Sequence, residues 1–300
     1  MKLGSIEVPR LGLGCMRIAS MTDAQADTYI RTALDEGLYF FDHADIYGGG
    51  QSEIIFGKAL KRTGRREDVV LQSKCGIRRG MYDLSKEYIL SSVDGILERL
   101  QVDYLDVLVL HRPDALMEPE EIAEAFDQLK ESGKVREFGV SNMNSRQIEL
   151  LQKYVHQKII TDQMQLSLTN CSMIREGINV NIEVQDKGID RDGNILDYCR
   201  LNDITIQTWS PLQYGMFSGT FLNNPDFPEL NAELDRQAEQ YGITKEAVAC
   251  AWILRHPAKM QVIVGSTNPA RMHGFAQAEK ISMTREDWYR LYIAAGNRLP

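Results

Sequence analysis

The sequence predicts an α/β fold, a closed (β/α)8 TIM barrel with a short N-terminal hairpin and extra helices near the C-terminus. Short apolar runs alternate with longer amphipathic runs along the 300 residues. Parallel strands are buried on both faces and need helical crossovers, which gives this alternation. Eight strand–helix units in about this length are typical of a barrel. We expect one domain over residues 1–300, because no linker-like or low-complexity segment divides the chain.

A doubly wound open sheet is the alternative fold. Such a sheet usually carries a glycine-rich phosphate-binding motif directly after its first strand. Here Gly12 and Gly14 form only a G-x-G pair, since Arg17 occupies the place of the third glycine. The first strand therefore favours the barrel.

The expected strands are short and rich in β-branched or aromatic residues, and each of the second to seventh barrel strands ends in a polar residue or is followed directly by one. A small hairpin is expected around Ile6–Val8, with Gly4 and Ser5 at its turn. The barrel strands follow at Leu11–Met16, Leu38–Asp42, Val69–Lys74, Tyr104–Leu110, Val135–Val140, Ile159–Gln163, Thr205–Trp209 and Gln261–Val264.

The expected helices have apolar residues three and four positions apart and recognisable end signals. Thr22 is a candidate N-cap for the first helix, Gly37 ends it, and Gly133 ends the fourth. The predicted ranges are Thr22–Glu36, Ser52–Lys61, Ser85–Leu100, Pro119–Glu131, Ser145–Tyr154, Ile195–Arg200, Asn231–Tyr241, Thr244–Arg255, Pro269–Ala278 and Thr284–Ala295.

Composition and charge narrow the possible partners. The net charge of −8 disfavours nucleic acid and anionic membrane surfaces as main partners. No apolar run is long enough to span a bilayer, and the first residues lack a signal core, so we expect a cytoplasmic protein. The 5 cysteines are scattered without a C-x-x-C pair, which argues against disulfides and a zinc site.

One connection, Met164–Gly193, is unusually long for a barrel. Such a length is typical of a functional lid or of a segment without regular structure. Its residues 190–193, Asp-Arg-Asp-Gly, resemble half of a calcium loop, but the closing glutamate is absent, so we expect no metal.

Polar groups gather at the carboxyl ends of the predicted strands, where barrel enzymes carry their active sites. Each residue has an ordinary explanation when taken alone, such as packing for a tyrosine or surface exposure for a lysine. Together they form one chemical device. The residues at these ends are Asp42, Tyr47, Lys74, His111, Ser141, Asn142, Gln163, Trp209 and Ser210.

Together these residues suggest a proton donor whose pKa is shifted by its neighbours. A phenol has a pKa near 10 in water, and a neighbouring ammonium group lowers that pKa. Asp42 would hold the Lys74 ammonium charged and oriented beside Tyr47. His111 would hydrogen-bond a substrate carbonyl and fix its direction. Such a set protonates an oxygen that gains charge while hydride arrives at carbon.

Neighbouring residues are expected to support the site rather than react. We predict that His43 and Asp45 stabilise the loop of Tyr47, and that residues 48–50, Gly-Gly-Gly, supply backbone freedom for its turn. The segment 112–114, Arg-Pro-Asp, is expected to fix the loop after His111. In the last third, Asn268 and Pro269 open a helix with Arg271 in its first turn. This pattern indicates a capped helix or a phosphate-monoester site.

These motifs resemble the aldo-keto reductases, and the resemblance covers nearly the whole chain. Phe41–Gly48 is similar to the aspartate-to-tyrosine signature of that family, although His43 stands where threonine or serine is common. The other matching runs follow in the family's order: Ser73–Lys74, Leu108–Pro113, Gly139–Asn142, Gln163, Trp209–Leu212, Gly265–Ser266 and Arg271.

The resemblance implies roles for individual residues. Tyr47 is the general acid, Lys74 lowers its pKa, Asp42 pairs with Lys74, and His111 orients the carbonyl. The implied cofactor is NADPH, with NADH as the alternative, bound extended and without a dinucleotide fold. The residues implied to bind it are Met16, Ser141, Asn142, Gln163, Trp209, Ser210, Pro211, Leu212, Gly265, Ser266 and Arg271.

Departures from the family pattern concentrate at the cofactor end. Asp162 replaces a frequent asparagine, and Gly265 stands where some members carry a phosphate-binding lysine. Gly274 and Phe275 replace a Glu-Asn pair that often lies under the adenine. The choice of NADPH over NADH therefore rests mainly on Arg271.

The expected activity is reduction of an aldehyde or ketone to an alcohol without a metal. Two alternatives remain open: a cofactor-binding redox sensor or regulatory protein on the same barrel, and a net alcohol or sugar dehydrogenase. No motif specifies the physiological substrate or the oligomeric state.

Overall fold

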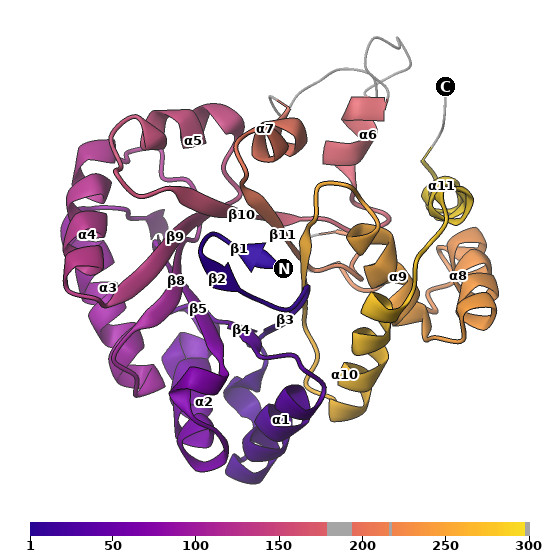
Figure 1. Cartoon of the computed structure of the whole chain (residues 1–300), viewed down its shortest axis with the longest axis horizontal. Helices are drawn as coiled ribbons and strands as arrows, with labels where there is room; N and C mark the ends of the chain where they lie inside the picture. The colour runs from indigo at the N-terminus through magenta and orange to yellow at the C-terminus, as the bar shows by residue number, and fades with distance from the viewer. Residues whose placement is uncertain (179–193, 216–217, 298–300) are drawn as a thin grey trace.

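The computed structural model describes residues 1–178, 194–215 and 218–297, and its centre is the predicted closed barrel (Figure 1). Eight parallel strands form the ring in the order β10-β11-β12-β3-β4-β5-β8-β9. Leu11 of the first barrel strand pairs with Val262 of the last, which closes the ring. The strands are β3 (Leu11–Gly14), β4 (Phe40–Asp42), β5 (Val70–Cys75), β8 (Leu105–Leu110), β9 (Val135–Ser141), β10 (Ile159–Gln165), β11 (Thr205–Trp209) and β12 (Gln261–Val264).

Helices surround the ring, as Figure 1 shows, and all ten predicted helices are present with small shifts of their ends. Thr22 forms a capping box with Gln25 at the start of the first helix, as its sequence predicts. The helices are α1 (Asp23–Asp35), α2 (Gln51–Thr63), α3 (Lys86–Leu100), α4 (Pro119–Glu131), α5 (Ser145–Gln152), α6 (Ser172–Ile178), α7 (Ile195–Leu201), α8 (Pro228–Tyr241), α9 (Lys245–Leu254), α10 (Pro269–Ala276) and α11 (Arg285–Ala294).

One of these helices begins earlier than predicted, and another was not predicted. α8 begins three residues before the predicted Asn231, because Pro228 provides a favourable first helical residue. α6 was not predicted and lies in the long connection after β10. The second part of that connection, including the calcium-like residues 190–193, lies outside the described residues.

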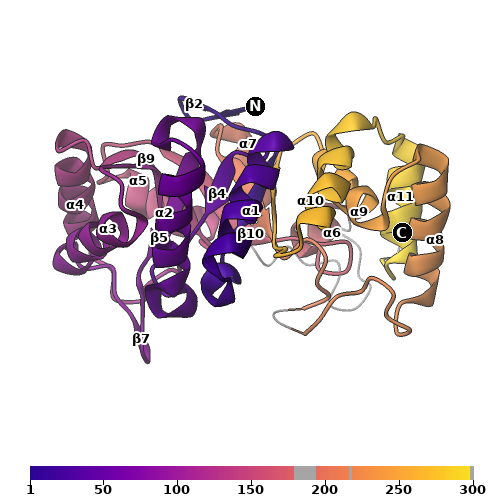
Figure 2. The same ribbon diagram turned by 90° about the horizontal axis from the view of Figure 1, so that it is seen from below.

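Two hairpins lie at opposite ends of the barrel (Figure 2). The predicted one, β1 (Lys2–Leu3) and β2 (Ile6–Glu7), covers the amino-terminal end. Its Leu3 and the following Val8 are buried against strand residues that include Phe40 and Ile160. The other, β6 (Ile77–Arg78) and β7 (Met81–Tyr82), was not predicted and projects at the carboxyl end.

The additional C-terminal helices are joined to one another by a buried carboxylate. Asp287 of α11 accepts hydrogen bonds from Arg236 and Tyr241 of α8, at 2.7 and 2.6 Å. Burial opposes ionisation of Asp287, but these donors outweigh it and lower its pKa to about 2. Within the described part of the chain, no helix has the length and apolar character needed to cross a bilayer.

Candidate active site

The carboxyl ends of the strands bring the four predicted catalytic residues together. Asp42 is the last residue of β4, and Tyr47 lies five residues later in the loop before α2. Lys74 lies in β5, next to β4, and His111 directly follows β8, next to β5. Lys74 and His111 are far in sequence from Asp42 and Tyr47, and the order of neighbouring strands brings all four residues together.

Lys74 is the centre of the group. Its Nζ donates to both carboxylate oxygens of Asp42 at 2.7 Å, to the backbone oxygen of His43 at 2.8 Å, and to Tyr47 Oη at 3.2 Å. Lys74 is completely buried, and Asp42 is 2% exposed. A buried ammonium group is stable only with such partners, so this pair is held rigidly beneath the phenol.

Burial opposes the charge on Lys74, but Asp42 and Tyr47 outweigh it and raise the pKa of the lysine. Burial also raises the pKa of Tyr47, and the Lys74 charge acts in the opposite direction without cancelling this effect. The sequence-based expectation of a lowered tyrosine pKa is therefore corrected. In this structure Lys74 limits a rise in the pKa of Tyr47, and the phenol keeps its proton at neutral pH.

His111 lies beside Tyr47 as a neutral imidazole. The two ring centroids are 6.1 Å apart with an edge-on orientation. Burial, together with the charges of Lys74 and Arg112, lowers the pKa of His111 to about 2. A neutral ring can donate one N–H to a carbonyl oxygen without adding charge to the site.

The loop that carries Tyr47 is supported from below by a second ion pair. Glu53 of α2 is fully buried and accepts from Ser73 Oγ and Arg99 Nε, both at 2.7 Å. Gly50 has φ +88°, and a Cβ there would lie 2.8 Å from Arg99 Cδ. The glycine run therefore supplies the turn, as the sequence predicted. It also leaves room for the Arg99 side chain.

His43 and Asp45 lie behind the loop, where the sequence predicted support. The His43 ring packs edge-on against Phe56 at 4.5 Å, and burial lowers its pKa to about 3. Burial and the charge of Glu53 raise the pKa of Asp45 to about 6. Neither residue lines the main cavity described next.

A cavity of about 880 Å³ extends from the catalytic group to the start of α10. Its volume is in the range of sites for large organic ligands. Ten of the eleven predicted cofactor-binding residues line it: Met16, Ser141, Asn142, Gln163, Trp209, Ser210, Pro211, Leu212, Gly265 and Arg271. The exception is Ser266, which is 7% exposed and accepts a hydrogen bond from the Asn268 N–H within its own turn.

The strand ends that line the cavity have constrained geometry. Ser141 Oγ donates to the Gln163 backbone oxygen and accepts from Asn142 Nδ2, both at 2.7 Å. Asn142 and Ser210 have φ values of +58° and +51°, which residues other than glycine rarely adopt. Such strain is typical of functional sites, because surrounding structure must hold it in place.

Beneath the catalytic group, four buried glutamine side chains form a hydrogen-bonded chain across the barrel. Gln72 Nε2 donates to Asp42 at 2.7 Å and to Gln207 Oε1 at 2.8 Å. Gln207 Nε2 donates to Gln261 Oε1 at 2.9 Å, and Gln261 donates to the Pro9 backbone oxygen. The fourth, on β10, donates to Asp42 at 3.1 Å and is the Gln163 of the predicted cofactor set.

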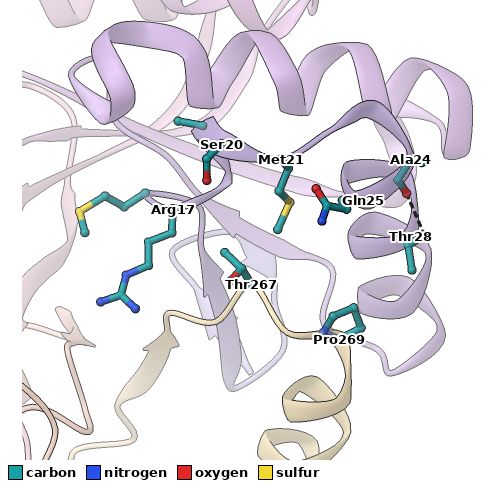
Figure 3. A pocket seen from close by; sticks show the side chains of 10 residues that line it. Arg17, Ser20, Met21, Ala24, Gln25, Thr28, Thr267 and Pro269 are labelled. Carbon is teal, nitrogen blue, oxygen red and sulfur yellow. Dashed lines mark hydrogen bonds between the residues drawn. The ribbon is translucent and has the colours of Figure 1, made fainter.

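Several other cavity residues were not assigned to the site from the sequence, and five of them are Arg17, Ile46, Ile77, Tyr82 and Arg112. Arg17 and Met16 also line a second cavity of about 850 Å³ between the loops after β3 and β12 (Figure 3). Figure 3 shows Arg17 directed away from Gln25 and Thr28 of α1. Two of the five residues, Ile77 and Tyr82, belong to the unpredicted hairpin at the carboxyl end, and no periodic pattern marks such two-residue strands.

A buried lysine–carboxylate pair lies beside a phenol and an imidazole at the carboxyl end of the (β/α)8 barrel, which is where the class of barrel enzymes carries its active sites. Among the described residues, no group of three histidine, cysteine or acidic side chains is arranged to hold a metal ion.

The comparisons narrow this class. The model of the Aldo/keto reductase family matches residues 10–294, and the chain belongs to that family. Its members are oxidoreductases that act on carbonyl groups and use NADP(H). This chain is therefore an oxidoreductase enzyme.

Several relatives match over nearly the full length. An oxidoreductase of Bacillus subtilis (strain 168), YcsN, is 36% identical over 296 residues, which cover 94% of this chain and 92% of that protein. The 6-dehydroglucose reductase of Agrobacterium fabrum is 33% identical and covers 97% and 95%. The crystal structure of the thermostable aldo-keto reductase Tm1743 has a TM-score of 0.77 at 26% identity and covers 98% of both chains.

Proposed function

We propose that this protein reduces an aldehyde or ketone to an alcohol by hydride transfer from NADPH, with Tyr47 as the general acid. The observation that carries the proposal is the 3.2 Å contact of Tyr47 Oη with Lys74 Nζ, which is itself paired to Asp42. A protonated phenol that faces a cavity next to a neutral imidazole suits donation to a carbonyl oxygen.

In the proposed reaction, the carbonyl oxygen lies between Tyr47 Oη and the His111 ring. A nicotinamide held beside Ser141, Asn142 and Gln163 would supply hydride to the carbonyl carbon. His111 orients the oxygen, and Tyr47 gives its proton to that oxygen as negative charge develops there. The Lys74 ammonium then stabilises the phenolate left behind, and Asp42 keeps the ammonium charged.

The described residues fit a dinucleotide in several respects. The cavity extends from Tyr47 to Arg271, and a Cβ on Gly265 would meet nothing within 4 Å, so the backbone there is open to a ligand. The hydrogen bonds of the Gln163 side chain use only Nε2, which leaves Oε1 to accept from the nicotinamide amide. The Arg271 side chain is 59% exposed, and its Nε lies 4.0 Å from Glu246 Oε1. Because this ion pair is long and exposed, a 2′-phosphate could take the place of the carboxylate.

We further propose that residues 1–300 form one domain that holds both cofactor and substrate. The pairing of β3 with β12 supports this proposal, because strands from both ends of the chain complete the same ring. The cytoplasmic setting remains a prediction from the sequence.

The test is the Tyr47→Phe variant, with Tyr289→Phe as a matched control outside the cavity lining. An aldehyde panel with NADPH should show a loss of about 100-fold or more in kcat for Tyr47→Phe. NADPH binding, followed by fluorescence, should stay nearly unchanged in both variants. Retained turnover in Tyr47→Phe would refute the acid assignment.

The regulatory alternative makes a different prediction with the unaltered protein. It expects tight NADPH binding but no useful turnover of an activated aldehyde. The panel should include sugar-derived aldehydes, because the name of the Agrobacterium relative is that of a reductase acting on one. Faster alcohol oxidation than carbonyl reduction at cellular cofactor ratios would favour the dehydrogenase alternative.

A further inference from the structure

Arg112 is a cationic side chain in the main cavity that the proposed reaction does not use. It directly follows His111 and lines the cavity. Its guanidinium lies 6.0 Å from the centroid of the Trp209 ring, and within residues 1–178, 194–215 and 218–297 it forms no hydrogen bond or ion pair. Its charge is close enough to His111 to contribute to the lowered pKa of that ring.

The loop after β8 does not need the Arg112 side chain for its shape. The sequence suggested that the segment 112–114 fixes this loop, and in the structure Asp114 does so. Its carboxylate accepts from the backbone N–H groups of Leu116 at 2.9 Å and Leu84 at 3.2 Å. Asp114, the acidic residue nearest to Arg112 in the sequence, therefore bonds to backbone groups and not to Arg112. The Arg112 side chain lines the cavity instead.

The other cationic side chains along the cavity have a source of negative charge nearby. At the catalytic end Asp42 neutralises Lys74, and at the far end Glu246 is near Arg271. Arg17 has no carboxylate partner among the described residues, but it lies beside Met16, on the predicted cofactor side, where cofactor phosphates would supply negative charge. Arg112 directly follows His111, and neither a carboxylate of the cavity nor the cofactor phosphates are expected to neutralise its charge.

We infer that Arg112 binds a carboxylate carried by the substrate, so that the preferred substrates are aldehydes or ketones with a carboxylate group. This inference rests on the proposed reductase function. A guanidinium presents parallel N–H donors that match a carboxylate, and the Trp209 ring, 6.0 Å from the Arg112 guanidinium, lines the same cavity. Ile77 and Tyr82 provide apolar surface in the same cavity, and lower polarity strengthens such a charge pair.

The experiment compares two aldehydes of the same shape, 4-carboxybenzaldehyde and the neutral 4-nitrobenzaldehyde. In Arg112→Met, kcat/KM for the carboxylate should fall about 10- to 100-fold, while that for the nitro compound changes less than about 3-fold. Arg112→Lys should recover only part of the loss, because a point charge replaces the two-pronged donor. Arg17→Met removes the same charge from the cavity and should affect both aldehydes equally.

A binding measurement separates this inference from the reductase proposal. With NADP⁺ present, calorimetry should show that 4-(hydroxymethyl)benzoate binds the wild type at least 10-fold more tightly than 4-(hydroxymethyl)benzamide, and that Arg112→Met removes the difference. This readout needs no turnover, so it remains informative if neither aldehyde is reduced. Equal binding of both ligands by wild type, or an equal loss on both aldehydes in Arg112→Met, would overturn the inference. So would a loss confined to neutral hydroxyaldehydes such as glyceraldehyde, which would assign Arg112 to hydroxyl groups.

Discussion

Replacing Lys74 with methionine tests the buried ion pair on which the proposed site depends. The change removes every hydrogen-bond contact that Nζ makes with Asp42, His43 and Tyr47. Among the described residues, only the side-chain amides of Gln72 and Gln163 then donate to the Asp42 carboxylate, which is buried. Breaking one partner of a buried pair typically costs about 3–5 kcal/mol. We expect Lys74→Met to lose this much stability and at least about 100-fold in kcat.

The double variant Asp42→Asn/Lys74→Met separates stability from catalysis. It replaces both charges by neutral groups of similar size, and such replacements are often neutral or stabilising. We therefore expect the double variant to recover most of the lost stability. Its activity should stay as low as that of Lys74→Met, because no ammonium limits the pKa of Tyr47.

Urea unfolding followed by circular dichroism measures the stability part of this prediction. With a slope of about 3 kcal/mol per molar urea, the single variant should unfold at a midpoint about 1–1.7 M lower. Lys134→Met breaks the exposed pair with Asp94, whose side chains are 41% and 59% exposed, and should change stability by less than about 1 kcal/mol. A stable Lys74→Met, or a double variant no more stable than the single one, would refute the reasoning.

Three further outcomes are expected. Because the pKa of Tyr47 lies above its usual value, the rate of carbonyl reduction should be constant from about pH 7 to 9 and fall only as the phenol ionises. The rate of alcohol oxidation should instead rise with pH. A decline in the rate of reduction already at about pH 8 would contradict this expectation. Arg271→Ala should weaken NADPH binding about 10- to 100-fold and NADH binding little, as measured by fluorescence titration; equal losses would show that no 2′-phosphate is bound there. Asp287→Asn should lower the free energy of unfolding by about 2 kcal/mol at pH 7, because the folded pKa of about 2 lies below the unfolded value. That stabilisation is complete above the unfolded pKa and is lost as pH falls towards 2, so the two proteins should converge in acid urea titrations.

The sequence predicted the barrel, and it placed Asp42, Tyr47, Lys74 and His111 near one another, because both predictions depend on local signals. An apolar run that ends in Asp42 or His111 marks both a strand and its carboxyl end, and the order of strands then brings the ends together. The glycines after Tyr47 likewise indicated a turn that needs positive φ values. These features require no knowledge of distant contacts.

The remaining features depend on packing that no short stretch encodes. The net rise in the pKa of Tyr47 comes from burial, which is known only once the surrounding chain is placed. Ser266 has the sequence context of a ligand-binding residue, yet its hydroxyl is used within its own turn. Arg112 has an acidic residue two positions away in the sequence, yet Asp114 accepts hydrogen bonds from backbone groups instead.

The glutamine chain below Asp42 also restricts how protons reach the site. Carboxamides neither gain nor lose protons at ordinary pH, so a row of them conducts no proton towards the amino-terminal end of the barrel. The hydrogen bonds run from Gln72 and Gln163 to Asp42, and on the other side from Gln207 through Gln261 to the Pro9 carbonyl. In the proposed reaction, Tyr47 is therefore expected to regain its proton from the solvent at the open end of the cavity, and not through the barrel floor.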